Sequence, residues 1–243
     1  MFSKTARYYD KIYAFKDYHA ETQYLMAVIH QNLRSGGNRL LDVACGTGCH
    51  IEHLKQHFPD VEGLDISEDL LELARQRNPD VLFHRADMIH FALGRQFDAV
   101  TCLFSSIGYV RTIENLGRAI DCMAQHVRPG GVVLVEPWFT PDTWCPGTVH
   151  AQFIDEPDLK IARVNTSFSK GQLSYFDLHY LIGTPEGTVH FAERHELGLF
   201  AQNEMEAAFR AAGLEVSYDK EGLTGRGLYI GRLGYDQRPS ANQ

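Results

Sequence analysis

The chain lacks the features that mark secreted, membrane-bound or disulfide-stabilised proteins. Its five cysteines show no C-x-x-C spacing, so neither a disulfide framework nor a structural zinc site is expected. Its longest apolar stretches, such as residues 131–135, are far shorter than the roughly 20 residues of a membrane span. The residues after Met1 have no apolar signal-peptide core. We therefore expect a cytoplasmic protein with reduced thiols and no membrane partner.

Basic charge is also scarce. The chain has 23 Lys and Arg residues against 31 Asp and Glu residues, which gives a formal net charge of −8. A polyanionic partner requires a basic surface, so no nucleic-acid partner is expected. No internal repeat is visible. A hydrophobic content of 44% is nevertheless sufficient for a globular core.

Strand and helix patterns alternate along the first part of the chain. Short apolar strands are expected at residues 39–43, 61–64, 81–83, 97–103 and 132–135. Residues 128–131 are expected to form a turn before the last of these, and a helix is expected to start after Ser67. With two further strands near residues 214–218 and 227–231, this alternation predicts an α/β fold. It is a doubly wound, Rossmann-like, mostly parallel seven-stranded sheet.

The pattern changes after Pro137. Residues 161–168, 173–182 and 188–200 alternate polar and apolar side chains, which predicts an inserted antiparallel β-sheet. We expect this sheet to bind substrate or to form the interface of a homodimer. The expected division is a core of residues 1–137, the insertion of residues 138–200, the rest of the core at residues 201–234 and a flexible tail at residues 235–243.

The glycine-rich run Leu40-Leu41-Asp42-Val43-Ala44-Cys45-Gly46-Thr47-Gly48 lies between the first strand and a helix. Glycines at such a place let the backbone approach a ligand closely at the positive end of the helix. The dinucleotide fingerprint requires a third small residue, where this chain has Ile51. An NAD-binding dehydrogenase is therefore a disfavoured alternative.

The next two strands are each followed by an acid. Asp65 comes 17 residues after Gly48, where a carboxylate binds a ribose diol well. Asp87 can accept a hydrogen bond from an exocyclic amine while Met88 packs against adenine. Because the strand ends of a parallel sheet share one edge, the glycine loop and both acids predict a nucleoside site.

These residues resemble the pattern of class I S-adenosylmethionine (SAM)-dependent methyltransferases, with Ala44 in place of the first glycine. Almost the whole chain resembles the dTDP-amino-sugar N,N-dimethyltransferases of macrolide deoxysugar pathways. The matching stretches are Lys16-Asp17-Tyr18, residues 41–48, residues 94–97, Phe104-Ser105-Ser106-Ile107-Gly108-Tyr109, Val135-Glu136-Pro137-Trp138 and Thr224-Gly225-Arg226-Gly227.

The resemblance implies SAM as the cofactor, S-adenosylhomocysteine as its product, a small-molecule acceptor and no metal. It implies that Tyr9 and Tyr18 hold the methionine end of SAM and that Leu103 lines the adenine. The expected cofactor-binding residues are Tyr9, Tyr18, Ala44, Gly46, Gly48, Asp65, Ile66, Asp87, Met88 and Leu103. The expected substrate-binding residues are Ser105, Ser106, Tyr109, Trp138 and Arg226. Among these, Tyr109 is expected to orient the nucleophile, and Arg226 is expected to face a nucleotide phosphate.

SAM carries its own leaving group, so the protein supplies mainly proximity and orientation. An N-methyltransferase needs no dedicated base, because water can remove the proton. An O-methyltransferase would need one, and no histidine lies in the segment after the fourth strand. The leading hypothesis is N-methylation of an amino-sugar nucleotide. The alternatives are O- or N-methylation of another secondary metabolite, such as a heterocycle, or a non-catalytic SAM-binding protein.

The histidines do not suggest a metal site. His50, His53 and His57 have helical spacing without a paired carboxylate signature, so we expect them to form a solvent-exposed helix face. His190 and His195 should point to opposite faces of one strand, so we do not expect them to bind one metal ion together.

Overall fold

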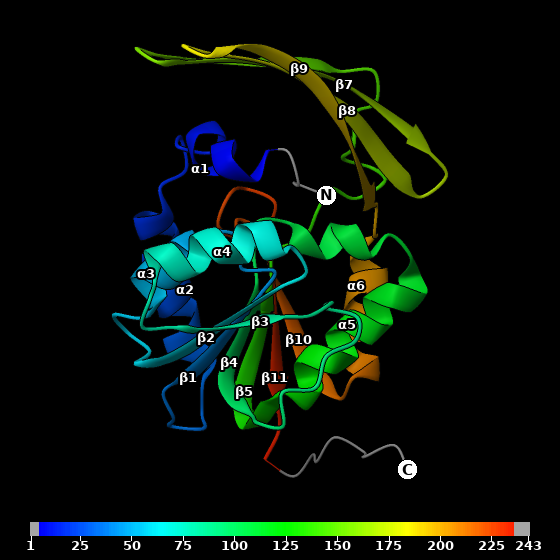
Figure 1. Cartoon of the computed structure of the whole chain (residues 1–243). Coiled ribbons are helices and arrows are strands. Elements are labelled where there is room, and N and C mark those ends of the chain that lie inside the picture. Colours follow the sequence, from blue (N-terminus) through cyan, green and yellow to red (C-terminus); the bar gives the residue numbers. More distant parts are fainter. Residues whose placement is uncertain (1–4, 236–243) are drawn as a thin grey trace.

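The computed structural model describes residues 5–235, and residues 1–4 and 236–243 lie outside the described residues. All but the first residue of the expected flexible tail therefore falls outside that range. The described chain forms one seven-stranded sheet flanked by helices and one separate four-stranded sheet (Figure 1).

The larger sheet has the strand order β10-β11-β5-β4-β1-β2-β3. All neighbouring strands are parallel except β11, which is antiparallel to both β5 and β10. The strands are β1 (Arg39–Val43), β2 (Asp60–Asp65), β3 (Leu82–Arg85), β4 (Phe97–Cys102), β5 (Val127–Val135), β10 (Leu214–Asp219) and β11 (Leu228–Leu233). The predicted mostly parallel, Rossmann-like fold is confirmed.

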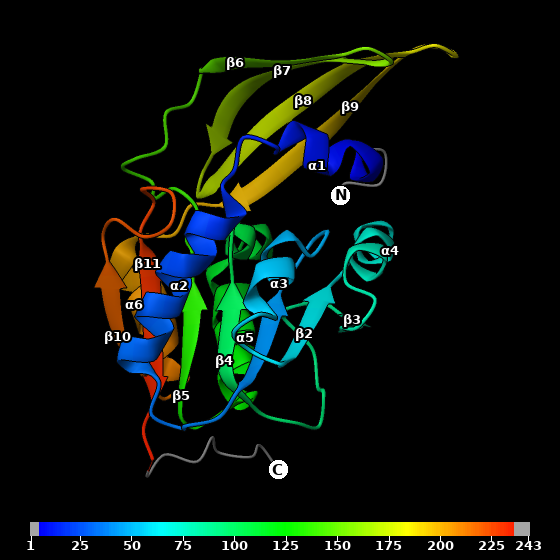
Figure 2. The ribbon, with the colours of Figure 1, turned by 90° about the vertical axis from the view of Figure 1, so that its left-hand side faces the viewer.

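Helices cover both faces of this sheet (Figure 2). One face is covered by α2 (Tyr18–Asn32), α3 (Cys49–Leu54) and α4 (Glu68–Arg77), and the other by α5 (Ile113–Gln125) and α6 (Gln202–Ala211). Side chains alternate along β1, so Leu40 belongs to the first of these cores, while Leu41 and Val43 belong to the second. Burial on both faces explains why the parallel strands are almost uniformly apolar.

Three helices begin at side-chain caps that the sequence provides. The Ser67 hydroxyl accepts a hydrogen bond from the amide of Leu70 at 3.4 Å, and α4 starts as predicted. The Asp17 carboxylate caps α2, and the Thr112 hydroxyl caps α5, each through the amide three residues later.

The prediction of a turn at residues 128–131 is wrong, because these residues belong to β5. The pairing of β5 with β4 is irregular there, with a shift in register between Phe97 and Ala99. Gly130 has a φ of +80°, and its carbonyl oxygen accepts hydrogen bonds from the amides of Arg34 and Ser35. Proline and glycine therefore mark an irregularity inside a strand rather than its start.

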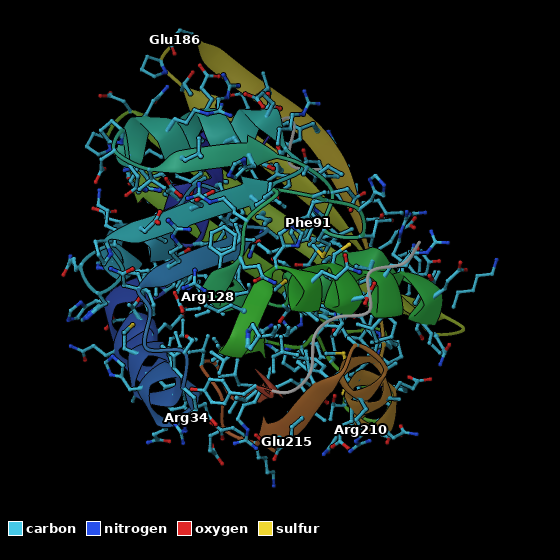
Figure 3. The ribbon with its side chains drawn as sticks, turned by 90° about the horizontal axis from the view of Figure 1, so that it is seen from below. Arg34, Phe91, Arg128, Glu186, Arg210 and Glu215 are labelled. Carbon is cyan, nitrogen blue, oxygen red and sulfur yellow. The ribbon has the colours of Figure 1, made fainter. Side chains whose placement is uncertain are left out.

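The smaller sheet, which we call the lid sheet, lies over the carboxyl ends of the parallel strands (Figures 1 and 2). Its antiparallel strands are β6 (Val149–Glu156), β7 (Leu159–Lys170), β8 (Leu173–Thr184) and β9 (Gly187–Gly198). The three predicted strands are confirmed, and β6 is an additional one. Figure 3 shows Glu186, in the β8–β9 turn, and Glu215, on β10, at opposite sides of the molecule.

The two faces of the lid sheet differ. The inner face packs Ile161, Tyr180 and Ile182 against Tyr8 and Ile12 of the N-terminal helices η1 (Ala6–Tyr8) and α1 (Tyr9–Ile12). These helices lie between the lid sheet and the core (Figure 2).

The outer face of the lid sheet leaves large apolar side chains exposed, including Val149, Phe153 and Leu181. The homodimer expected from the sequence stays a prediction. Between residues 5 and 235, no helix has both the length and the apolar character needed to cross a membrane.

Candidate active site

The glycine loop forms a cradle between β1 and α3. Gly46 has a φ of +57°, and an added Cβ would project into open space. Gly48 has a φ of +73°, and an added Cβ would lie 2.9 Å from the Asn78 amide nitrogen and 3.3 Å from Ala74 Cβ. Gly46 therefore leaves room for a ligand, and Gly48 allows α3 and α4 to pack closely.

Ala44 adopts a backbone conformation that favours glycine. Its φ is +59°, in the left-handed region, at the position where the resembling methyltransferases have a glycine. This conformation costs an L-residue roughly 1–2 kcal/mol. Ala44 is therefore a strained residue of the loop.

Replacing Ala44 with Gly is expected to raise the free energy of unfolding. Relief of the strain exceeds the roughly 0.4–1 kcal/mol of chain entropy that glycine adds to the unfolded state, so the net gain is about 0.5–1 kcal/mol. Thermal unfolding without ligand should show a higher midpoint. Ala86→Gly is the control, because Ala86 lines the same cavity but is not among the residues with positive φ. It should lower the midpoint. An Ala44→Gly variant that melts below the wild type contradicts the expectation.

Asp65 is held at the end of β2 by two backbone amides. One carboxylate oxygen accepts from the amide of Gly46 at 2.9 Å, and the other accepts from the amide of Ser67 at 2.8 Å. Burial raises the pKa of this carboxyl above its usual value, and the amides of Ser67, Gly46 and Ile66 act against that rise. A carboxylate has about four lone-pair sites, so Asp65 can also accept from a ligand hydroxyl.

A cavity of about 410 Å³ opens between the core and the lid sheet. Most predicted site residues meet here, namely Tyr9, Ala44, Gly46, Asp65, Ile66, Asp87, Met88, Ser106 and Tyr109. The lid sheet adds Arg194, His195 and Glu196 of β9, which the sequence did not suggest. The volume of this cavity suits a nucleoside with an extended polar tail, and so does its lining by the glycine loop, Asp65, Asp87 and Met88.

A second cavity of about 30 Å³ shares Tyr9, Ala44, Gly46 and Ser106 with the first, and is lined in addition by Tyr18, Asp42, His50 and Leu103. Two residues expected to contact adenine, Leu103 and Met88, therefore line different cavities. Met88 lies with Asp87 in the larger cavity, and Leu103 lies with Tyr18 in the smaller one. The expectation that Leu103 lines the adenine stays a prediction.

Asp42, at the smaller cavity, was not singled out from the sequence although it lies in the glycine-rich run. Its side chain is buried, and it accepts a hydrogen bond from the Thr101 hydroxyl at 2.7 Å. Burial raises the pKa of Asp42 to about 6. A carboxylate deprived of water in this way gains from a cationic ligand group.

The expectation of a solvent-exposed histidine face is wrong for His50. Its ring is buried because α2 packs on α3, and its Nε2 lies 2.8 Å from the Glu21 carboxylate. The other Glu21 oxygen accepts from Lys16 Nζ at 2.7 Å. This network fixes the segment before α2, and with it Tyr18, against the smaller cavity. In the described part of the chain, no cluster of His, Cys, Asp and Glu is arranged to hold a metal.

Tyr109, on the 3₁₀ helix η2 (Ser106–Val110), contacts a histidine that is 86 residues away in the sequence. Its hydroxyl lies 2.7 Å from His195 Nδ1 on β9. Burial lowers the pKa of His195 to about 4 and raises that of Tyr109 well above its usual value, so both side chains are neutral near pH 7. No histidine lies in the segment after the fourth strand, as the sequence showed, but His195 reaches it from β9.

Three predicted substrate residues, Ser105, Trp138 and Arg226, line neither cavity. Ser105 is buried, and its hydroxyl donates to the carbonyl of Pro137 at 2.6 Å. Trp138 donates its indole N–H to Ser174 at 2.9 Å and packs in an aromatic cluster at the base of the lid sheet. The other members of that cluster are Phe139, Trp144 and Phe176. Trp138 thus connects the core with the lid sheet, whereas Ser105 holds the segment that follows β5.

Arg226 lies above that aromatic cluster rather than in the cavity. Its guanidinium carbon is 5.5 Å from the ring centre of Trp138, 5.8 Å from that of Phe139 and 5.9 Å from that of Phe104. The buried Glu136 carboxylate lies 3.9 Å from its Nε. The same carboxylate accepts from the Phe104 amide at 2.6 Å, and so joins Arg226 to the edge of the smaller cavity.

Comparisons with known proteins agree with this geometry. Residues 40–131 match the family model described as a methyltransferase domain. The chain is 45% identical to dTDP-3-amino-3,4,6-trideoxy-alpha-D-glucopyranose N,N-dimethyltransferase of Streptomyces venezuelae, over 89% of this chain and 91% of the relative. It belongs to this family of SAM-dependent methyltransferases.

Two solved structures extend the match to the fold and the cofactor. The crystal structure of Streptomyces venezuelae DesVI superposes with a TM-score of 0.86 at 42% identity, covering 93% of this enzyme and 98% of that chain. SAM-bound CalS10 from Micromonospora echinaspora, an amino pentose methyltransferase, superposes with a TM-score of 0.81 at 39% identity, covering 89% and 91%. The enzyme uses SAM, and the NAD-dehydrogenase alternative is excluded.

Proposed function

We propose that the enzyme transfers methyl groups from SAM to the amino group of a dTDP-linked amino sugar and gives the N,N-dimethyl product. The observation that carries this proposal is the identity of 45% over 89% of the chain to a relative named for this substrate class. The contact of Arg226 with Phe104 at the smaller cavity also supports it, because a nucleotide diphosphate is bound well by a cation beside the acceptor site.

The residues of the two cavities fit SAM. Asp65 would accept from the ribose hydroxyls, which its remaining lone pairs allow, and Asp87 with Met88 would receive the adenine. Tyr18 and Asp42 would hold the methionine end, where Asp42 complements the α-ammonium group. Tyr9 lines both cavities, so it would lie where they join, beside the sulfonium.

The acceptor is expected to lie between Tyr109 and Arg226. Phe104 connects the two regions, because it lines the smaller cavity and also contacts the Arg226 guanidinium. The diphosphate would bind the guanidinium through charge-assisted, bidentate hydrogen bonds. Trp138 supports the guanidinium from one side, and this is the role we assign to it in place of direct contact with the acceptor.

SAM supplies an activated methyl group on a sulfonium leaving group, so the protein must chiefly orient the amine. Tyr109 lines the larger cavity, where it would contact the amine, and the lid sheet with α1 would limit the access of bulk water from above. The cytoplasm, where the five cysteines would remain free thiols, is the compartment we propose.

The test is an assay of SAM consumption with dTDP-3-amino sugars, the corresponding free amino sugars and unrelated phenols, with mass spectrometry of the products. The expected result is successive monomethyl and dimethyl products from the dTDP-linked amine alone. Methylation of a phenol, with no turnover of any amine, contradicts the proposal and favours the O-methyltransferase alternative.

A further inference from the structure

Either Tyr109 or His195 can donate the hydrogen bond that joins them, and which one donates affects how Tyr109 meets the acceptor amine. A tyrosine hydroxyl has one proton to donate and lone pairs that accept, so it meets the amine either as a donor or as an acceptor. Both residues line the larger cavity, and their contact of 2.7 Å is a hydrogen bond whose direction depends on which ring nitrogen of His195 carries the proton.

The surroundings of His195 favour a proton on Nε2 and none on Nδ1. The Glu193 carboxylate lies 4.0 Å from His195 Nε2, and His195 is only 2% exposed. Burial disfavours the imidazolium, so the ring is neutral near pH 7. In the described part of the chain, the other ionisable groups around this pair include Tyr9 on α1, Tyr13 after α1, Asp65 at the end of β2, Arg163 on β7 and Tyr180 on β8. With the proton on Nε2, Nδ1 is an acceptor.

We propose that His195 is a positioning residue that fixes the direction of the Tyr109 hydroxyl, which donates to His195 Nδ1 and turns its oxygen lone pairs toward the cavity. This inference rests on the proposed N-methylation. Tyr109 then accepts a hydrogen bond from an N–H of the neutral amine and leaves the nitrogen lone pair free for the methyl carbon. A hydroxyl turned the other way would donate to that lone pair and block it.

The same direction serves both methylations. In each, the nitrogen lone pair forms the new N–C bond while the C–S bond breaks and its electron pair stays on sulfur. The product ammonium then releases a proton to water. The monomethylated amine keeps a single N–H, so the second transfer depends most on an acceptor that binds this hydrogen and not the lone pair. Loss of the His195 acceptor should therefore affect the second methylation more than the first.

Acid should reverse the arrangement. A protonated His195 donates from Nδ1 to the Tyr109 oxygen, and the hydroxyl proton then turns toward the amine. The folded-state pKa of about 4 lies below the ordinary value of 6.5. The stability contributed by the neutral ring is therefore present above pH 6.5 and is lost as the pH falls toward 4.

The test compares His195→Phe, which keeps a ring against Phe176 but has no acceptor, with His195→Asn, whose side-chain oxygen can take the place of Nδ1. His195→Phe should lower kcat about tenfold, the value of one hydrogen bond, and should accumulate monomethyl product. His195→Asn should restore most of the rate and the dimethyl product. Combined with Tyr109→Phe, His195→Phe should cost nothing further, since both remove the same contact. His57→Phe, at an exposed histidine, is the matched control and should leave activity unchanged.

A measurement that needs no turnover separates this inference from the proposed function. Nitrogen-15 NMR of the SAM-bound enzyme at pH 7 should show the His195 proton on Nε2, with His195→Phe used to assign the signal. A proton on Nδ1 overturns the inference whatever the substrate proves to be. Equal defects in the Asn and Phe variants, or additive effects with Tyr109→Phe, would reduce His195 to a packing residue. Absence of turnover on every amino sugar would instead refute the proposed function.

Discussion

Replacing Asp65 with Ala is expected to weaken SAM binding by about 1.5–3 kcal/mol, which is a factor of roughly 10–150 in the dissociation constant. The carboxylate is expected to accept from the ribose hydroxyls, and these are hydrogen bonds to a charged group. It also accepts from the amides of Gly46 and Ser67, so its loss removes one of the hydrogen bonds that hold the glycine loop at the end of β2. Both effects lower affinity, and titration calorimetry with SAM measures their sum.

The control for that variant is Asp80→Ala. Asp80 is exposed, pairs with Lys55 on the surface and lines neither cavity, so its removal should leave SAM affinity unchanged. Circular dichroism should show that both variants remain folded. An Asp65→Ala enzyme that binds SAM as tightly as the wild type would remove Asp65 from the cofactor site. The nucleoside would then have to be placed elsewhere in the larger cavity.

The part of the site that the sequence predicted is the part built from single strand ends. The glycine loop, Asp65 and Asp87 each follow a strand of a parallel sheet, and parallel strands bring their carboxyl ends to one edge. Local pattern was sufficient there, because topology alone carries those residues together. Ser67 likewise predicted the start of α4, since a cap acts within one turn of its helix.

The residues that were missed depend on packing between distant elements. His195 reaches Tyr109 only because the lid sheet folds over η2, and the strand pattern showed the opposed faces of β9 without showing what lies beneath them. His50 is buried because α2 covers α3, so its position on a polar helix stripe was misleading. Gly130 belongs to an irregular strand, because its carbonyl oxygen is bound by residues before β1.

The core and the lid sheet contribute different residues to the site. The core supplies the residues expected to bind SAM, and these lie at the strand ends and in the glycine loop. The lid sheet supplies His195 directly, and it fixes Trp138 through Ser174 of β8. We therefore expect acceptor recognition to depend on the position of the lid sheet, and cofactor binding to depend mainly on the core. Variants of the acceptor site should for this reason separate substrate KM from SAM affinity.

Arg226→Ala is expected to raise KM for a dTDP-amino sugar about 10- to 100-fold, with SAM affinity unchanged, because Arg226 lines neither cavity. Arg226→Lys should recover only part of this loss. Lysine keeps the charge but lacks the planar fork that binds two phosphate oxygens and lies against Trp138 and Phe139. Steady-state kinetics with saturating SAM measures KM, and calorimetry measures SAM binding.

The control for Arg226 is Arg210→Ala, which removes an exposed arginine that pairs with Glu206 on α6 and should leave both constants unchanged. A rise in KM with kcat preserved is the pattern of lost uniform substrate binding, and it would place the diphosphate at Arg226. If Arg226→Ala is indifferent and amino sugars without the nucleotide react equally well, the acceptor carries no diphosphate. Glu136, whose buried carboxylate joins Arg226 to the Phe104 amide, would then have only a structural role.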